Sequence, residues 1–205
     1  NMLLKIYPDS PSIQNIETVV DIFNKGGVVI FPTDTIYGLG CGIRHLKAVN
    51  RISMIKGLKK GHTNFSMIIN NMSMLSDFTK PIPNHIFRLM RKNLPGPFTF
   101  ILNASSSVPK IFQSKKKTIG VRMPDNNIIR TIVEELNMPI LTTSIRDEDE
   151  IVEYTTDPEL IYEKYMKMVD IVIDGGYGDN EASTIVDCTS EVPEILRQGK
   201  GILEE

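Results

Sequence analysis

Short apolar runs alternate with longer amphipathic stretches along this chain, a pattern typical of α/β proteins. The short runs predict strands at Leu3–Tyr7, Gly27–Phe31, Phe65–Ile69, Phe98–Leu102, Thr118–Arg122, Ile140–Thr143, Ile171–Ile173, Thr184–Asp187 and Glu194–Arg197. The amphipathic stretches predict helices at Ile13–Lys25, His45–Lys56, Asn84–Lys92, Asn126–Leu136 and Asp157–Met166. We therefore expect one mixed, twisted sheet with helices packed against it.

Length and composition favour a single domain that extends over residues 1–205. The 205 residues are 41% hydrophobic and 23% charged, which suits a chain that buries a sizeable core. No apolar run approaches the length of a membrane span, so we expect a cytoplasmic protein that does not contact a membrane. The two cysteines and three histidines lack metal-ligand spacing, and we expect no metal bound by side chains.

The segment from Val28 to Gly42 joins an apolar run to a polar stretch that packing alone does not explain. Pro32 stops regular pairing after the apolar run, and hydroxyl groups follow at Thr33, Thr35 and Tyr37. The glycines at 38, 40 and 42 let a backbone approach a bound group closely. We expect a loop that cradles an anion; the alternative is a glycine-rich turn that only reverses the chain.

Charge is strongly segregated along the chain. Between Thr35 and Pro124 there are 15 Lys and Arg residues and a single acid, Asp77, whereas the rest of the chain holds 8 basic and 24 acidic residues. The overall charge of −2 conceals this division. A basic window that also contains the polar, glycine-rich segment predicts a concave, positively charged face for an anionic partner such as a nucleotide, pyrophosphate or RNA. The alternative is a solvated surface without a ligand.

Several segments, in order along the chain, match one family. They are PTDTIYGLG at 32–40, Lys56, LPGPFTFIL at 94–102, IGVRMP at 119–124, LTTS at 141–144, STIVD at 183–187 and ILRQG at 195–199. With them the chain resembles the YrdC-like threonylcarbamoyl-adenylate synthases. HTNFSMII at 62–69 and KKKTIGVRMP at 115–124 are similar to the YciO subfamily. The resemblance implies the single-domain YrdC-like fold.

The resemblance also implies a reaction. A member of this family joins L-threonine, bicarbonate and ATP, with Mg²⁺ carried by the ATP phosphates, into threonylcarbamoyl-adenylate and pyrophosphate. The product serves the N6-threonylcarbamoyladenosine modification of tRNA, and other proteins would transfer it. Such a nucleotidyltransferase positions and neutralises its substrates, which agrees with the lack of a Ser/His/Asp or Cys/His arrangement in this sequence.

Matching positions carry the family's site residues to this chain. The resemblance implies a catalytic group of Lys56, Arg122 and Ser144, a substrate-binding group of Thr35 and Ser183, and a nucleotide-binding group of Lys60, Asn64, Thr99 and Arg197. Arg122 stands out without the resemblance, because an arginine between apolar strand residues has to be paired or to face a cavity. Thr99 and Arg197, by contrast, also fit an ordinary strand position.

Two positions depart from the synthase pattern and keep other functions open. Leu58 stands where the synthases carry an arginine of a Lys-x-Arg pair, and Arg146 stands where they carry an asparagine. A guanidinium only donates hydrogen bonds, whereas an amide also accepts them. The alternative is a YciO-type protein that binds nucleotide or RNA, double-stranded RNA and tRNA included, with weak or no synthase activity. A pocket that binds and processes a threonylcarbamoylated nucleoside is a third possibility.

Overall fold

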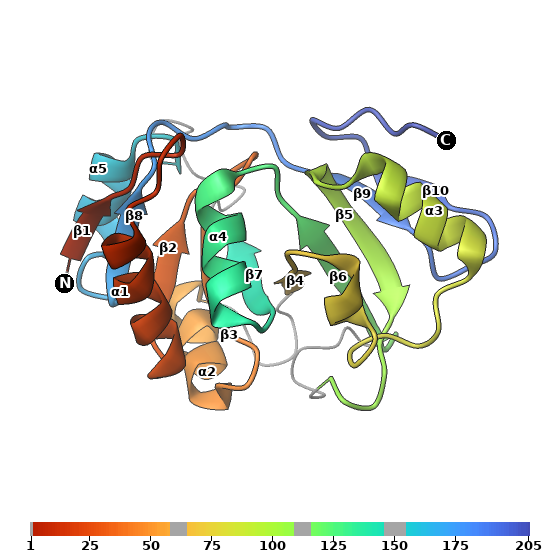
Figure 1. Ribbon diagram of the computed structural model, residues 1–205, viewed down its shortest axis with the longest axis horizontal. Coiled ribbons are helices and arrows are strands. Elements are labelled where there is room, and N and C mark those ends of the chain that lie inside the picture. Colours follow the sequence, from red (N-terminus) through yellow and green to blue (C-terminus); the bar gives the residue numbers. More distant parts are fainter. Residues whose placement is uncertain (1, 58–64, 109–115, 146–154) are drawn as a thin grey trace.

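Within residues 2–57, 65–108, 116–145 and 155–205, which the computed structural model describes, ten strands form one sheet (Figure 1). The strands are β1 (Met2–Lys5), β2 (Val29–Phe31), β3 (Gly38–Gly42), β4 (Ser66–Ile68), β5 (Gly96–Asn103), β6 (Thr118–Met123), β7 (Ile140–Ser144), β8 (Ile171–Asp174), β9 (Thr184–Asp187) and β10 (Glu194–Arg197). Their order is β1-β8-β2-β3-β7-β4-β6-β5-β9-β10. The pairs β1/β8, β2/β8, β4/β6 and β5/β9 are parallel and the others antiparallel, so the expected mixed sheet is confirmed.

Every helix expected from the hydrophobic pattern is present. The helices are α1 (Ile13–Asn24), α2 (Leu46–Ile55), α3 (Asn84–Asn93), α4 (Asn127–Leu136) and α5 (Pro158–Tyr165). The Asn126 side chain accepts hydrogen bonds from the first N–H groups of α4, and the Asp157 carboxylate does the same for α5. A short 3-10 helix, η1 (Met72–Leu75), was not expected from the sequence.

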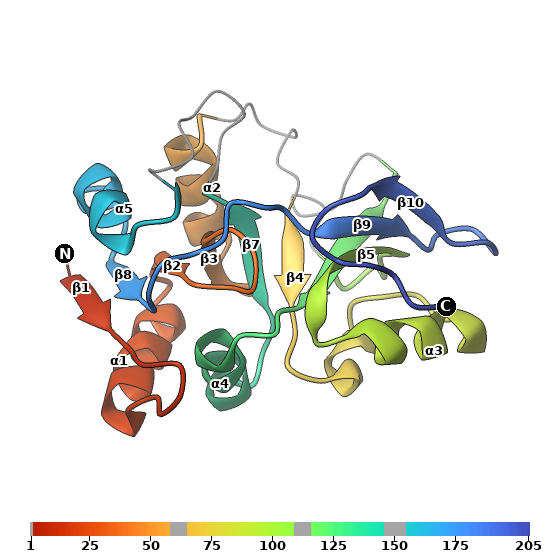
Figure 2. The same ribbon diagram turned by 90° about the horizontal axis from the view of Figure 1, so that it is seen from above.

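The helices cover both faces of the sheet and produce two apolar layers. On one face α1 and α4 lie side by side (Figures 1 and 2), and Phe23 and Ile132 pack there with Phe31 of β2. The second layer contains residues of α2, α3 and α5, among them Ile52 of α2 and Met90 of α3. In the part of the chain that the structure describes, no helix is long and apolar enough to cross a membrane.

The glycine-rich segment 38–42 is a buried strand, so the expected loop conformation is wrong there, while anion binding by the loop before it stays a prediction. β3 pairs with β2 on one side and β7 on the other, and all five of its residues are buried. A Cβ atom at Gly38 or Gly40 would lie 2.8 Å from a ring carbon of Phe31. Successive side chains of a strand alternate between faces, so these two glycines share the face on which the ring lies. The alternating glycines therefore make room for an aromatic ring.

Candidate functional site

The face of the sheet that α1 and α4 cover changes from apolar to polar along the strands. Ile68 of β4 pairs with Ile140 of β7, and both belong to the apolar layer of α1 and α4. Two residues away on the same face, Ser66 pairs with Thr142 of β7 and with Gly120 of β6. Ser66, Gly120 and Thr142 therefore form a small and polar surface at this end of the sheet, which we call the floor of the site.

The loop between β2 and β3 is held in one shape by its own hydroxyl groups. The Thr33 hydroxyl donates to the Ile36 carbonyl at 2.9 Å, accepts the Thr35 N–H at 3.0 Å, and lies 3.2 Å from the Thr35 hydroxyl. Thr33 and Thr35 are both buried. The Tyr37 hydroxyl donates to the Gly176 carbonyl at 2.7 Å, which ties the loop to the segment after β8. The hydroxyls at 33 and 37 therefore stabilise the loop, while Thr35 faces the site.

Arg122 enters this loop from β6. Its Nη2 atom donates to the Thr35 hydroxyl at 2.8 Å and lies 3.3 Å from Oδ1 of Asp34. The Nε atom is buried and has no hydrogen-bond partner among the residues that the structure describes. Burial raises the pKa of Asp34, and burial lowers the pKa of Arg122 although the two charges attract. The expectation that Arg122 is paired or faces a cavity is met on both counts.

A cavity of about 460 Å³ collects most of the site residues predicted from the sequence. Its lining comprises Thr35, Ile36, Arg122, Ser144, Ala182, Ser183 and Arg197. Behind this lining the hydroxyls of Thr99 and Ser183 share a hydrogen bond of 2.7 Å. Nη2 of Arg197 donates to the Ser183 carbonyl at 2.7 Å. Residues from five separate segments of the chain thus present hydroxyl and guanidinium groups to one space.

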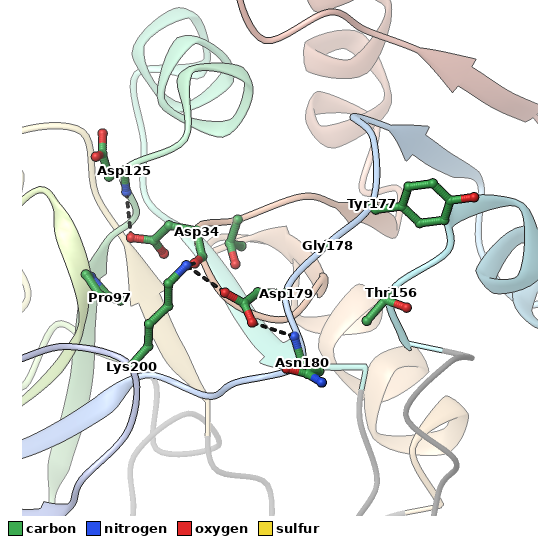
Figure 3. Close-up of a pocket in the computed structure, with 10 residues that line it drawn as sticks. Asp34, Pro97, Asp125, Thr156, Tyr177, Gly178, Asp179, Asn180 and Lys200 are labelled. Carbon is green, nitrogen blue, oxygen red and sulfur yellow. Dashed lines mark hydrogen bonds and ion pairs between the residues drawn. The ribbon is translucent and has the colours of Figure 1, made fainter.

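A second cavity, of about 750 Å³, is also lined by residues of the loop between β2 and β3 (Figure 3). Asp34, Asp179 and Lys200 line it. Nζ of Lys200 lies 2.7 Å from Oδ2 of Asp179 and donates to the Asp34 carbonyl at 2.8 Å, and Figure 3 shows the ion pair. The sequence reasoning missed these three residues. Asp34 sits inside the PTDT motif and Lys200 directly follows the ILRQG motif at 195–199, whereas Asp179 lies in a segment without a motif.

The remaining predicted site residues are not placed in either cavity. Lys56 caps the C-terminal end of α2 and is not among the lining residues of the two cavities. Lys60 and Asn64 lie outside the described residues. The described residues contain no group of three or more His, Cys, Asp or Glu side chains that could hold a metal ion. The assignments of Lys56, Lys60 and Asn64 stay predictions.

Three exposed cations of the basic window lie on α3, away from the site. Met90 of α3 belongs to the same apolar layer as Phe98 and Phe100 of β5, while Thr99 between them points to the opposite face. The exposed cations of α3 therefore lie across β5 from the floor of the site; they are Arg88, Arg91 and Lys92. The concave, positively charged face stays a prediction.

Comparison with known proteins identifies the family. A model of the Sua5, YciO and YrdC proteins, described as "Telomere recombination", matches residues 21–199. The chain belongs to this family. It is 41% identical over 198 residues to the YciO protein of Escherichia coli, with 96% of this chain and 94% of that protein covered. It is 30% identical to the threonylcarbamoyl-AMP synthase of Pyrococcus abyssi, with 93% of this chain and 55% of the synthase covered.

Solved structures of two members share the fold. The match to the crystal structure of Escherichia coli YciO extends over 100% of this chain and 98% of the YciO chain, with a TM-score of 0.90 and 39% sequence identity. The match to Pyrococcus abyssi Sua5, crystallised with L-threonine, extends over 97% of this chain and 58% of the Sua5 chain, with a TM-score of 0.88 and 27% sequence identity. The family resemblance and the YrdC-like fold expected from the sequence are thereby confirmed.

Proposed function

We propose that this member of the Sua5, YciO and YrdC family is an ATP-dependent threonylcarbamoyl-adenylate synthase, and that the Thr35–Arg122 cavity is its active site. The observation that carries the proposal is Arg122, which lines a cavity with hydroxyl groups and whose buried Nε has no partner among the described residues. Buried donors of this kind are costly unless a ligand satisfies them. A carboxylate offers the geometry that a guanidinium prefers.

The amino-acid substrate occupies the Arg122 side of the cavity. Its carboxylate accepts from Nε of Arg122, and the Thr35 hydroxyl, which already contacts this guanidinium at 2.8 Å, faces the same space. Support comes from the relative Sua5 of Pyrococcus abyssi, which was crystallised with L-threonine. We assign L-threonine as the amino acid on that basis.

ATP occupies the Arg197 side of the cavity as the second substrate. Ser144, Ser183 and Arg197 line this side and provide hydroxyl and guanidinium donors, which suit phosphate oxygens. Thr99 supports Ser183 from behind through the hydrogen bond between their hydroxyls. Lys56, Lys60 and Asn64 complete the nucleotide contacts in this proposal. Mg²⁺ arrives with the ATP phosphates.

The reaction then proceeds without a nucleophilic side chain. The ammonium group of L-threonine loses a proton, and the resulting amine condenses with bicarbonate to a carbamate and water. A carbamate oxygen attacks the α-phosphorus of ATP, the bond to the β-phosphate bridging oxygen breaks, and pyrophosphate leaves. The role of the protein is to position the two anions and to offset their charge. The product, threonylcarbamoyl-adenylate, supplies tRNA modification in the cytoplasm.

A second candidate function is nucleotide or RNA binding with weak or no synthase activity. Leu58 and Arg146 favour it, because they replace an arginine and an asparagine of the synthase pattern. A leucine removes a charge that would hold phosphate, and an arginine at 146 removes the hydrogen-bond acceptor of an amide. Both residues lie outside the described part of the chain.

The test is chromatographic detection of threonylcarbamoyl-adenylate from ATP, L-threonine and bicarbonate with the purified protein. We expect product to form with the wild type and to fall at least tenfold in Arg122→Met, which keeps the length of the side chain and removes the guanidinium. Omitting bicarbonate is the control for ATP hydrolysis. ATP binding measured by calorimetry together with no product from the wild type would favour the second candidate.

A further inference from the structure

The Asp34 side chain links the linings of the two cavities. Asp34 lines the cavity of about 750 Å³, and Arg122 lines the cavity of about 460 Å³. The side chains of Arg122 and Asp34 are only 11% and 9% exposed. Their contact of 3.3 Å between Nη2 and Oδ1 therefore joins one cavity to the other.

Both oxygen atoms of this carboxylate are in use. Oδ1 faces Nη2 of Arg122, and Oδ2 accepts the backbone N–H of Asp125 at 2.9 Å (Figure 3). Asp125 lies two residues after the end of β6, and its donor belongs to the main chain, so the carboxylate is held at a fixed angle. Nη2 of Arg122 then lies between two fixed acceptors, Oδ1 of Asp34 and the Thr35 hydroxyl at 2.8 Å. A planar guanidinium held in this way has one orientation, in which Nε has no partner among the described residues.

We propose that Asp34 is a positioning residue, which acts through Arg122 and orients Nε of the guanidinium toward the substrate carboxylate. The proposal rests on the proposed function only for the identity of that substrate. The competing view is that Asp34 merely neutralises Arg122 and so competes with the substrate for the guanidinium. The two views predict opposite changes in affinity when the Asp34 charge is removed.

Asparagine cannot replace Asp34 in this arrangement. An amide has one acceptor oxygen, whereas Asp34 serves two donors, the guanidinium of Arg122 and the N–H of Asp125. In Asp34→Asn, one of these donors therefore faces the amide NH₂ group. The guanidinium also loses the charge that accompanies it in a site with little access to water. We expect the Arg122 side chain to take several orientations in this variant.

Calorimetric titration with two ligands tests the proposal. The ligands are L-threonine and L-threoninamide, which lacks the carboxylate. We expect Asp34→Asn to weaken L-threonine binding at least tenfold and to change the binding of L-threoninamide less than twofold. Asp170→Asn is the matched control, because it breaks an Asp–Arg pair with Arg51, 2.6 Å long, outside both cavities. Equal or tighter L-threonine binding by Asp34→Asn would overturn the proposal.

A readout without ligand separates this proposal from the proposed function. In NMR spectra of the free protein, the Arg122 Nε–H signal should be sharp and slow to exchange in the wild type. It should broaden or exchange at least tenfold faster in Asp34→Asn and stay unchanged in Asp170→Asn. An unchanged Arg122 signal in Asp34→Asn overturns the positioning role even if L-threonine never binds. If Asp34→Asn does not fold, Asp34→Glu is used instead, because it displaces the charge by one methylene group. An Arg122 Nε–H signal and an L-threonine affinity like those of the wild type in Asp34→Glu would overturn the proposal.

Discussion

Gly38 of β3 lies directly opposite Phe31 of β2, and a Cβ atom added at Gly38 would lie 2.8 Å from the Phe31 ring. The contacts around this position come from side chains, those of Phe31 and Thr142. At Gly40 the nearest atom is instead a backbone oxygen, that of Leu141, at 2.7 Å. The two glycines therefore differ in what an added methyl group would displace.

We expect Gly38→Ala to lower the free energy of unfolding by about 2 kcal/mol through overpacking against the Phe31 ring. Phe31→Leu removes that ring, so the double variant should lose less stability than the sum of the single variants. Gly40→Ala should show no such compensation, because the backbone of Leu141 stays in place. Urea denaturation of the single and double variants measures this, and additive losses for Gly38→Ala with Phe31→Leu would contradict the steric explanation.

The hydrogen bond between Thr99 and Ser183 should stabilise the junction of β5 and the segment before β9. Both residues are buried, and their hydroxyls lie 2.7 Å apart. Thr99→Val and Ser183→Ala should each cost about 1 kcal/mol of unfolding free energy. The double variant should cost about as much as one single variant, because both remove the same bond. Denaturant titration of all three provides the comparison, and ATP calorimetry on them tests the role proposed for Ser183.

The raised pKa of Asp34 gives stability a specific pH dependence. Because burial raises this pKa above the ordinary value of 3.8, the folded protein holds the Asp34 proton more tightly than the unfolded chain. The stabilising contribution is complete below pH 3.8 and is lost as the pH rises through the Asp34 pKa of the folded state. As the pH rises above 3.8, the unfolding free energy of the wild type should therefore fall relative to that of Asp34→Asn. Parallel curves would show that Asp34 titrates normally.

Restoring the synthase residues should raise synthase activity. Leu58→Arg returns a guanidinium to the position where the synthases hold phosphate, and a charge-assisted hydrogen bond contributes about 1.5–3 kcal/mol. We expect kcat/KM for ATP to rise by about tenfold or more. Arg146→Asn should add to this, with coupling between the two changes if both contact one triphosphate. Normal ATP binding without more product would show that these positions do not limit the reaction.

RNA binding, if it uses the basic window, should be electrostatic and weakly dependent on RNA sequence. Neutralising Lys115, Lys116 and Lys117 should weaken RNA binding and reduce the salt slope by about 0.7 per lost phosphate contact on a single strand. Lys115 lies outside the described residues. Titrations at two salt concentrations measure both quantities. Neutralising the three cations of α3 in a second variant shows whether that part of the basic window contributes as well. Unchanged affinity and salt slope for the lysine variant would show that the lysine run is only a solvated surface.

The family and nearly every element of the fold can be predicted from the sequence alone. Hydrophobic periodicity located the five helices because it reports the face that each helix buries, and caps at Asn126 and Asp157 marked two of their starts. Arg122 was recognisable as a site residue because a charged side chain within an apolar strand needs a partner or a cavity. These signals are local, so a single chain displays them without its neighbours.

Other features of the fold and the site depend on contacts between distant segments, which the local signals leave open. Alternating glycines fit a flexible loop and a crowded strand equally well. Pairing with β2 and β7 makes Gly38 and Gly40 strand residues, and the nearby Phe31 ring leaves no room for a side chain at either. Asp34 became part of the site through Arg122, which is distant in sequence and is brought within 3.3 Å by the pairing of strands. The cations of α3 and the site lie on opposite faces of the sheet, because side chains along β5 alternate between the two faces. Contacts between distant segments depend on strand order and register, which local composition does not specify.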